Sequence, residues 1–178
     1  MFSKKTLIST LAAAGCLLGS LPAISWAQSN PGLTIFSGVR DRDNLLNYHL
    51  DFGGRAGGWD RYRLRIPKRK MELGVAQIAI SYPDYYEGKF DVDRIEVRLD
   101  GESQPLSEVN WDKENYLVQI YLEEPIQAGQ DVEVVFSNVK NPSFGGTFYF
   151  NCQILTPGDI PLPRYLGTWV LSIGQSGG

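Results

Sequence analysis

The sequence is poor in the residues that most often catalyse reactions or bind transition metals. Its 178 residues include one histidine, His49, and two cysteines, Cys16 and Cys152. A single histidine cannot supply a zinc site of the usual histidine and cysteine kind. A G-x-S-x-G pattern occurs at residues 174–178, but this predicted flexible tail is unsuited to holding a nucleophilic serine in place. These shortages argue against a zinc enzyme or a hydrolase with a catalytic triad.

Positive charge and long apolar runs are also scarce. The chain has 17 lysines and arginines against 20 acidic residues, a net charge of −3. Domains that bind nucleic acids are usually basic, so we expect no nucleic-acid partner. Apart from the N-terminal stretch, no apolar run approaches the roughly 20 residues that a membrane span requires, so the mature chain is predicted to have no such span.

The first 27 residues have the layout of a secretory signal. Lys4 and Lys5 form a short positive region, and residues 7–24 are mostly apolar or small. The tripeptide Ser25-Trp26-Ala27 then gives the small-x-small pattern of a signal-peptidase site. Cleavage after Ala27 leaves 178 − 27 = 151 residues with 15 cations, 20 acids and a net charge of −5. The predicted location is the periplasm, the thylakoid lumen or the cell exterior.

Cleavage would leave Cys152 as the only thiol and exclude an internal disulfide. An alternative begins at Cys16, because the tetrapeptide AAGC ending there resembles a lipobox, which would give a lipid-anchored N-terminus. A third reading is an uncleaved anchor. The residues after Cys16 stay apolar, whereas lipoproteins usually continue into a polar tether. We therefore prefer simple cleavage and export.

Alternation with a period of two dominates the sequence after residue 58, which is typical of β-strands. Residues 61–66 place Tyr62, Leu64 and Ile66 on one face, and residues 147–155 alternate in the same way. Further strands are expected at 75–82, 94–99, 106–111, 116–122, 132–139 and 168–173. The chain shows no amphipathic helix longer than about two turns. The pattern predicts an all-β fold with a single antiparallel β-sandwich, immunoglobulin-like or jelly-roll-like, preceded by a cleavable signal segment.

The predicted organisation has four parts. Residues 1–27 are the signal, 28–58 are a lead-in and glycine-rich loop at the domain edge, 59–173 are the sandwich, and 174–178 are a flexible tail. Asp100-Gly101 is a hairpin turn of the primed type, and residues 112–115 form a four-residue hairpin loop.

Several turn and strand motifs resemble one protein family. The motifs are VKNP at 139–142, GGTFYF at 145–150, TPGD at 156–159 and LGTW at 166–169. Together with YRLRIP at 62–67 and PIQAG at 125–129, they are similar to an exported cyanobacterial family, the domain of unknown function 2808. The resemblance covers about residues 59 to 173. It implies export and a β-rich fold, and it implies no activity.

The most unusual segment is 82–93, which combines carboxylates with aromatic rings. Its acidic residues are Asp84, Glu87, Asp91 and Asp93. Closely spaced hard oxygen ligands suit Ca²⁺, although the spacing does not match an EF-hand loop. The alternative is a solvated acidic loop, and we expect no other cofactor.

The same segment contains Tyr82, Tyr85 and Tyr86. Exposed tyrosines beside carboxylates would stack on a sugar or form a protein interface. In the alternative, these rings pack under the loop.

Cations cluster on the first predicted strand and just after it. They are Arg61, Arg63, Arg65, Lys68, Arg69 and Lys70. The three arginines share one face of the strand, which would suit an acidic polysaccharide, a membrane headgroup or an acidic protein. The alternative is a solvated face balanced by Glu96 and Glu102.

The sequence therefore predicts an exported, non-enzymatic binding or structural module whose partner is an envelope protein or an acidic polysaccharide. A carbohydrate-binding module for surface or matrix polysaccharide is the first alternative, and a metal-dependent hydrolase is the second. His49 is interpreted as a surface histidine, and Cys152 as a buried structural cysteine because it shares a face with apolar residues.

Overall fold

A computed structural model describes residues 42–158 and 162–174, which belong to the unit from Ser37 to Gly178. The predicted signal 1–27 with Cys16, residues 28–41 of the lead-in, and residues 159–161 and 175–178 lie outside the described residues. In the described ranges, no helix is long and apolar enough to cross a membrane.

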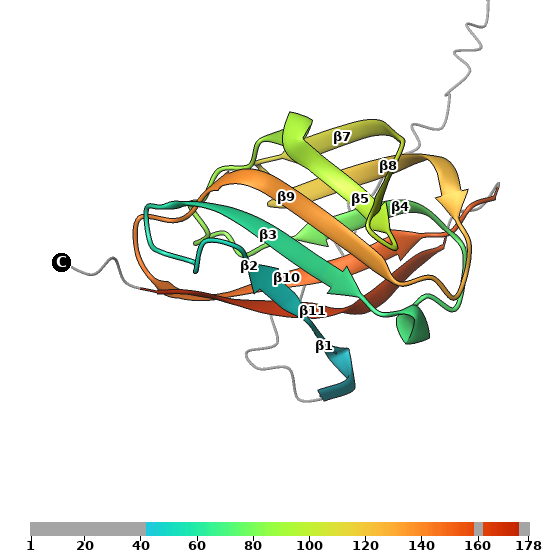
Figure 1. Cartoon of the computed structure of the whole chain (residues 1–178), viewed down its shortest axis with the longest axis horizontal. Helices are drawn as coiled ribbons and strands as arrows, with labels where there is room; N and C mark the ends of the chain where they lie inside the picture. The colour runs from blue at the N-terminus through green and yellow to red at the C-terminus, as the bar shows by residue number, and fades with distance from the viewer. Residues whose placement is uncertain (1–41, 159–161, 175–178) are drawn as a thin grey trace, which may run out of the picture. The chain divides into compact units, whose positions relative to one another are not determined.

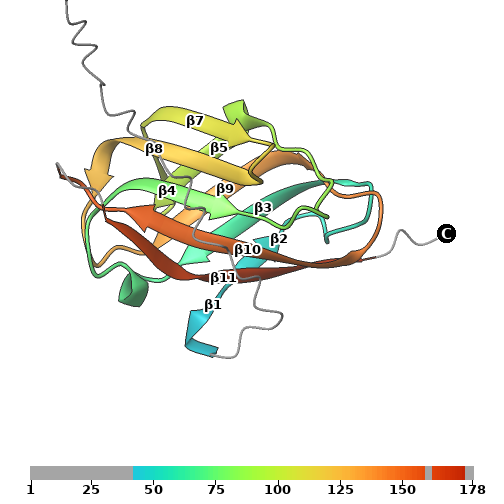
Figure 2. The same cartoon turned by 180° about the vertical axis from the view of Figure 1, so that it is seen from behind.

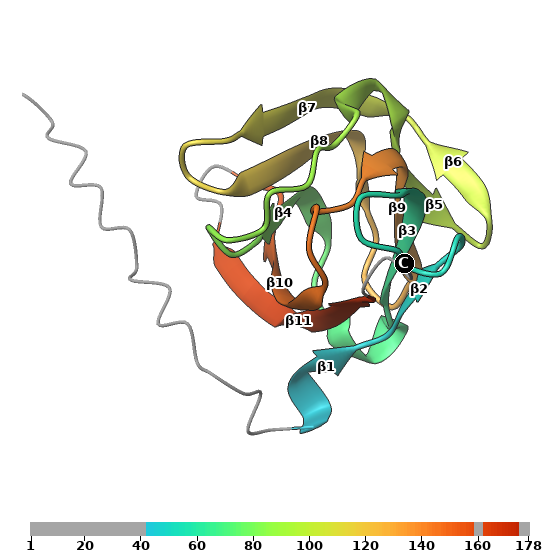
Figure 3. The same cartoon turned by 90° about the vertical axis from the view of Figure 1, so that its left-hand side faces the viewer.

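Two β-sheets pack face to face (Figures 1 and 3). Sheet A has the strand order β1 (Leu45–Leu46), β11 (Pro163–Ile173), β10 (Gly146–Leu155), β4 (Val75–Ser81), β8 (Leu117–Ile126) and β7 (Leu106–Asp112). Sheet B has the order β2 (Tyr48–Leu50), β3 (Trp59–Ile66), β9 (Val132–Lys140), β5 (Ile95–Leu99) and β6 (Glu102–Gln104). Three short 3₁₀ turns complete the described secondary structure: η1 (Arg42–Asn44), η2 (Lys68–Lys70) and η3 (Val92–Arg94).

The core lies between the sheets and is built from the inward half of each alternating strand. Tyr62, Leu64 and Ile66 on β3 are at most 1% exposed. Phe150 and Cys152 on β10 are equally buried. The predicted all-β sandwich and these inward faces are confirmed, because a strand that lines a core must place apolar residues at every second position.

The chain crosses between the sheets near its first strands. β1 pairs with β11 in parallel, whereas every other strand pairing in the described residues is antiparallel. β2 begins two residues after β1 ends and joins the other sheet. Sequence reasoning missed β1, β2 and β6 because strands of two or three residues are too short to display a period.

The two predicted hairpins are present. Asp100 and Gly101 have φ values of 49° and 89°, as a primed two-residue turn requires. In the second hairpin the Asp112 carboxylate accepts bonds from the backbone amides of Glu114 and Asn115.

Candidate functional site

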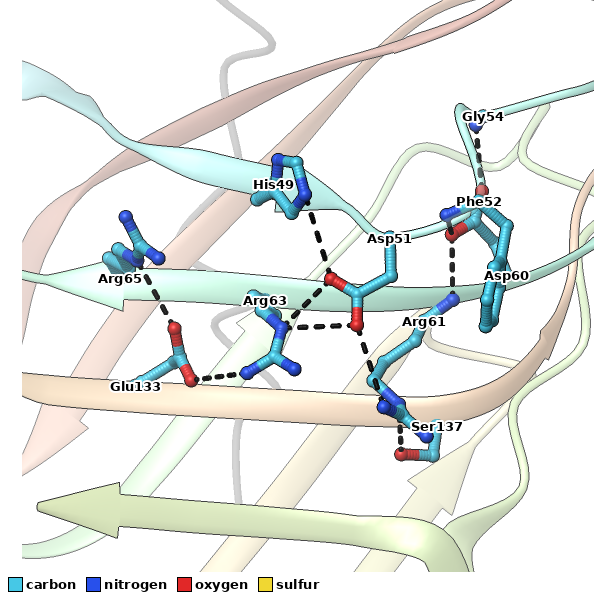
Figure 4. A network of polar contacts seen from close by, with 10 residues as sticks. All are labelled: His49, Asp51, Phe52, Gly54, Asp60, Arg61, Arg63, Arg65, Glu133 and Ser137. Atoms are coloured by element: carbon cyan, nitrogen blue, oxygen red, sulfur yellow. Dashed lines mark hydrogen bonds and ion pairs between the residues drawn. The ribbon is translucent and has the colours of Figure 1, made fainter. Parts of the chain in front are cut away.

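The arginine face is the outer surface of β3, formed by Arg61, Arg63 and Arg65. These side chains share one face because Tyr62 and Leu64 between them point into the core. Figure 4 shows the three arginines reaching over the neighbouring strands β2 and β9. The predicted common face is therefore formed.

Acidic side chains of neighbouring segments neutralise much of this face. Arg63 Nε lies 2.8 Å from Asp51 Oδ1, and Arg63 Nη1 lies 3.2 Å from Glu133 Oε2. Arg65 Nε is 3.1 Å from Glu133, and Arg61 Nη1 is 3.5 Å from Asp51. The arginine face therefore has Asp51 and Glu133 as built-in counter-ions.

The ion pairs shift the protonation of Asp51. Partial burial of the Asp51 carboxylate raises its pKa, but the hydrogen bond and charge of Arg63, with the charges of Arg61 and His49, outweigh this effect. The net pKa of Asp51 is lowered. The Arg63 guanidinium has a raised pKa for the same reason, chiefly its hydrogen bond to Asp51. Both groups are charged at neutral pH, so each already has an ionic partner.

Arg98 lies near the arginine face but on β5, which is not the strand next to β3. β9 lies between β3 and β5, and Arg98 Nη2 is 2.8 Å from Glu96 Oε2. Glu96 thus balances Arg98, and the carboxylates that balance β3 are Asp51 and Glu133.

A hollow of about 560 Å³ lies where β3, the 100–101 turn and the start of β9 meet. Arg63, Arg65 and Arg98 line it together with Asp100, Asp131 and Glu133. Three guanidinium groups face three carboxylates, so the hollow has no surplus of positive charge. This balance gives little support to an acidic polysaccharide as its ligand.

A buried carboxylate fixes the glycine-rich loop beside this face. Asp60 is 1% exposed and accepts hydrogen bonds from the backbone amides of Phe52, Gly54 and Arg61 at 2.7–2.9 Å. Gly54 has a φ of 60°, a conformation that glycine adopts without strain. Asp60 therefore holds this loop against the edge of the domain.

The segment 82–93 folds its aromatic side chains inward. Tyr82 and Tyr86 are 7% and 3% exposed and make stacked and edge-to-face contacts with Phe90 and Phe150. Trp111 Nε1 donates to the Tyr82 hydroxyl at 2.6 Å. The prediction of an exposed tyrosine platform is wrong for Tyr82 and Tyr86, because their rings fill the core between the sheets.

Tyr85 is the member of that platform that reaches solvent. It is 43% exposed, and its ring lies 5.6 Å from the ring of Phe148. Tyr85 is thus the one tyrosine of the predicted three with an exposed ring. One exposed ring does not form the row of rings that the predicted sugar stacking needs.

The structure does not gather the four predicted calcium ligands. Asp84, Glu87 and Asp93 are exposed, and the Asp91 carboxylate accepts a bond from Asn138 Nδ2 at 2.8 Å. Across residues 42–158 and 162–174, no group of three histidine, cysteine or acidic side chains could hold a metal ion. The geometry therefore offers no support for calcium at this segment.

The single described cysteine is buried, whereas the single histidine is exposed. Cys152 is fully buried, and burial raises the pKa of its thiol. This confirms the interpretation of Cys152 as a buried cysteine. His49 is exposed, as predicted, with its Nε2 atom 3.7 Å from Asp51.

One end of the sandwich carries a set of exposed aromatic side chains, which we call the aromatic end. Its members and their exposed fractions are Phe52 (61%), Trp59 (58%), Tyr85 (43%), Phe144 (41%) and Tyr116 (40%). Figure 3 looks onto this end. Sequence reasoning missed four of the five, although a large aromatic residue next to glycines, as at Phe52 and Phe144, is a usable indication of a loop with an exposed ring.

Backbone hydrogen bonds tie together the loops of the aromatic end. Gly57 N donates to Pro142 O, and Asn141 N donates to Gly58 O. Lys89 and Lys140 exchange two such bonds, and Tyr82 N donates to Tyr116 O. The aromatic rings therefore project from a cross-linked set of loops.

Comparison with known families shows which family the chain belongs to. The model of the family described as "Protein of unknown function (DUF2808)" matches residues 33–173. The chain belongs to this family. The match extends the resemblance seen in the sequence to include β1 and β2, and it assigns DUF2808 no activity. No curated protein matches this DUF2808 chain.

Solved structures similar to this DUF2808 chain are distant in sequence. BslA, a bacterial hydrophobin, has 10% identity and a TM-score of 0.48, over 75% of this chain and 95% of its own. An uncharacterized protein from Nocardia farcinica with an immunoglobulin-like fold has 13% identity and a TM-score of 0.40, over 72% and 97%. The collagen-binding domain of a Staphylococcus aureus adhesin has 11% identity and a TM-score of 0.41, over 72% and 95%. The all-β sandwich of this DUF2808 chain is established by its own two sheets.

Proposed function

We propose that this DUF2808 chain is an exported, non-enzymatic module that binds a protein of the cell envelope through its aromatic end. The observation that carries the proposal is the set of five aromatic side chains, each at least 40% exposed, on loops joined by backbone hydrogen bonds. Large exposed apolar groups that gather on one part of a surface are typical of interaction sites.

The kind of side chain at the aromatic end favours a protein partner. Tyrosine and tryptophan are enriched among the residues that dominate protein binding energies. Phe52 and Phe144 have no polar atom that could hydrogen-bond to a sugar, so they suit apolar pockets. Lys140 Nζ lies 5.1 Å from the centre of the Trp59 ring, which adds a cation beside the apolar surface.

The proposal that the chain is exported rests on the N-terminal pattern of the sequence. A positive region, an apolar stretch and a small-x-small site precede residue 28. The proposed location covers the periplasm, the thylakoid lumen and the cell exterior, all of which lie beyond an export membrane. The cyanobacterial origin remains a prediction that the sequence resemblance suggests.

The non-enzymatic part of the proposal is supported by how the reactive groups are placed. Cys152 lies in the apolar core, and His49 Nε2 lies 3.7 Å from Asp51 at the outer surface. The Ser137 hydroxyl in the same network accepts a hydrogen bond from Arg61 Nε, not from His49 (Figure 4). A catalytic base must lie within hydrogen-bond reach of the group that it activates. These placements favour binding over hydrolysis.

Site-specific photo-crosslinking tests the proposal. A benzophenone amino acid is placed at Phe52, Trp59 or Phe144 in the full chain, which is expressed in its own host and irradiated. We expect one envelope protein to be cross-linked from at least two of these positions, because a partner that covers the end touches several rings.

Leu73 provides the matched control. It is 42% exposed, close to the 41% of Phe144, and it lies after η2 at the other end of the strands. Equal cross-linking from Leu73, or no protein adduct from any of the three aromatic positions, would overturn the proposal.

A further inference from the structure

The outward positions at the centre of sheet A carry no charge. On β10, β4 and the first half of β8, the residues that alternate with the buried ones lie in 147–155, 77–81 and 117–121, and none is acidic or basic. Exposed carboxylates border these positions: Glu123 continues the outward side of β8, and Glu108 on β7 pairs with Tyr121. We call these outward positions the amide face, because four of them are amides. The amides are Asn151, Gln153, Gln77 and Gln119, and the face also carries Tyr149 and Tyr121.

The amide face contrasts with the outer surface of sheet B. There the outward residues of β3, β9 and β5 include Arg63, Arg65, Glu133, Glu96 and Arg98, joined in ion pairs. The ion pairs thus lie on the outer surface of sheet B, whereas the positions of the amide face carry no charged side chain. In Figure 2 sheet A lies toward the viewer, and in Figure 1 sheet B does.

Strand register aligns the polar groups in rows across the sheet. One row contains Tyr165, Gln153, Ala79, Gln119 and Asn110, each the cross-strand partner of the next. Neighbouring strands lie about 4.8 Å apart, so this row extends for about 19 Å. Ala79 at its centre is small, which leaves the flanking amides accessible from above.

Some polar groups of the amide face accept hydrogen bonds from side chains of the neighbouring strands, whereas others have no partner in the described residues. Thr168 Oγ1 donates to Asn151 Oδ1, and Asn110 Nδ2 donates to Gln119 Oε1. Two buried atoms, Gln77 Nε2 and Ser81 Oγ, have no hydrogen-bond partner within the described ranges. Gln77 is 8% exposed, and a buried polar group without a partner is costly. Both atoms belong to outward positions of β4, so the unmet polar capacity lies on the amide face.

We infer that the amide face binds an uncharged polysaccharide. Sugar hydroxyls both donate and accept hydrogen bonds, and side-chain amides match them because each has two donors and a carbonyl acceptor. Tyrosine adds an apolar ring with a polar tip. Positions without charge match a neutral polymer, and the bordering carboxylates of Glu108 and Glu123 would repel an anionic one. This inference concerns a different surface from the aromatic end and stands independently of the proposed protein partner.

Affinity gel electrophoresis tests the inference with the purified protein. Native gels contain dextran, amylose, hydroxyethylcellulose or galactomannan as neutral probes, with alginate as the anionic comparison. Mobility is normalised to a gel without polymer. We expect retardation by at least one neutral polymer and none by alginate.

Variants then assign the retardation to the amide face. Ala79→Arg puts a long cation at the centre of the row and should raise the apparent dissociation constant at least about tenfold. Ser103→Arg is the matched control, because Ser103 is exposed on β6 beside Arg98 in sheet B and adds the same charge there. It should bind as the unmodified protein does.

Gln77→Leu separates a ligand role from a structural one. Removing an unpartnered buried amide should leave the melting temperature unchanged or raise it, whereas binding should weaken. Retained binding in both Gln77→Leu and Ala79→Arg would overturn the inference, as would the absence of retardation by all four neutral polymers. A dimer seen by light scattering and broken by Ala79→Arg, without polymer binding, would overturn it in favour of self-association. None of these outcomes affects cross-linking at the aromatic end.

Discussion

At the scale of single residues, two carboxylates organise the surface around the arginine face. Asp60 is buried and holds three backbone amides of the β2–β3 region. Asp51 lies at the surface and joins Arg61 and Arg63. The same kind of side chain therefore fixes a loop in one place and neutralises cations in the other. The difference follows from what surrounds each carboxylate, which residue type alone does not reveal.

The lowered pKa of Asp51 makes its contribution to stability depend on pH. A carboxylate whose pKa is lower in the folded protein stabilises the fold above the unfolded pKa, near 3.8, and loses this effect as pH falls through the folded pKa. We expect Asp51→Asn to melt below the unmodified protein at about pH 7 and the gap to close toward about pH 2. Thermal melts across this range measure it. A gap that stays constant down to about pH 2 would contradict the linkage.

At the scale of elements, the short strand β1 depends on a glycine of its partner β11. Gly167 has a φ of 152°, and a Cβ atom there would lie 2.6 Å from the backbone oxygen of Asn44 and 2.8 Å from Leu46 Cγ. Thr168 and Trp169 next to it pair with β1 in parallel. The close approach of η1 and β1 to β11 therefore requires a residue without a side chain at 167.

Gly167→Ala should destabilise the domain by about 2–4 kcal/mol, from overpacking together with backbone strain. Gly146→Ala is the matched control. Its Cβ would lie 3.4 Å from Phe148, and no positive φ applies, so we expect a change within about 0.5 kcal/mol. Urea unfolding measures both variants. Equal effects at the two positions would show that the approach of β1 is not the reason.

At the scale of the whole molecule, the two sheets are joined by polar contacts as well as by the apolar core. Trp169 of β11 is fully buried, and its Nε1 atom donates to the backbone oxygen of Arg65 on β3 at 3.1 Å. The backbone amide of Ser172 on β11 donates to the Tyr48 hydroxyl on β2 at 3.0 Å. These bonds set which parts of the two sheets face each other, because apolar contacts alone are not directional.

Trp169→Phe should lower the free energy of unfolding by about 2–4 kcal/mol, since it removes the indole donor to the Arg65 carbonyl and opens space in the core. Trp59→Phe makes the same change at a side chain that is 58% exposed and should cost less than about 0.5 kcal/mol. Chemical denaturation of both variants tests this prediction. Comparable losses would refute the joining role of the Trp169 indole.

The long strands could be predicted because burial on one face of a sheet leaves a direct record in the sequence. β3 and β10 follow their predicted ranges within two residues at each end, with the predicted side chains in the core. The burial of Cys152 followed from the same alternation. The candidate site was less predictable, since an exposed ring and a buried ring have the same residue type. Tyr85 and Tyr86 are adjacent in the chain, yet one reaches solvent and the other lies in the core.

The sequence by itself determined the all-β sandwich, the inward faces of its long strands and the shared face of Arg61, Arg63 and Arg65. These are local properties, fixed by the period of two along a strand. Only the tertiary structure decided that Asp51 and Glu133 neutralise those arginines, that the loops carrying Phe52 and Phe144 meet at one end, and that uncharged residues of β4, β8 and β10 form one face. The physical reason is that each depends on which distant strands become neighbours, and pairing between strands leaves no period in the sequence.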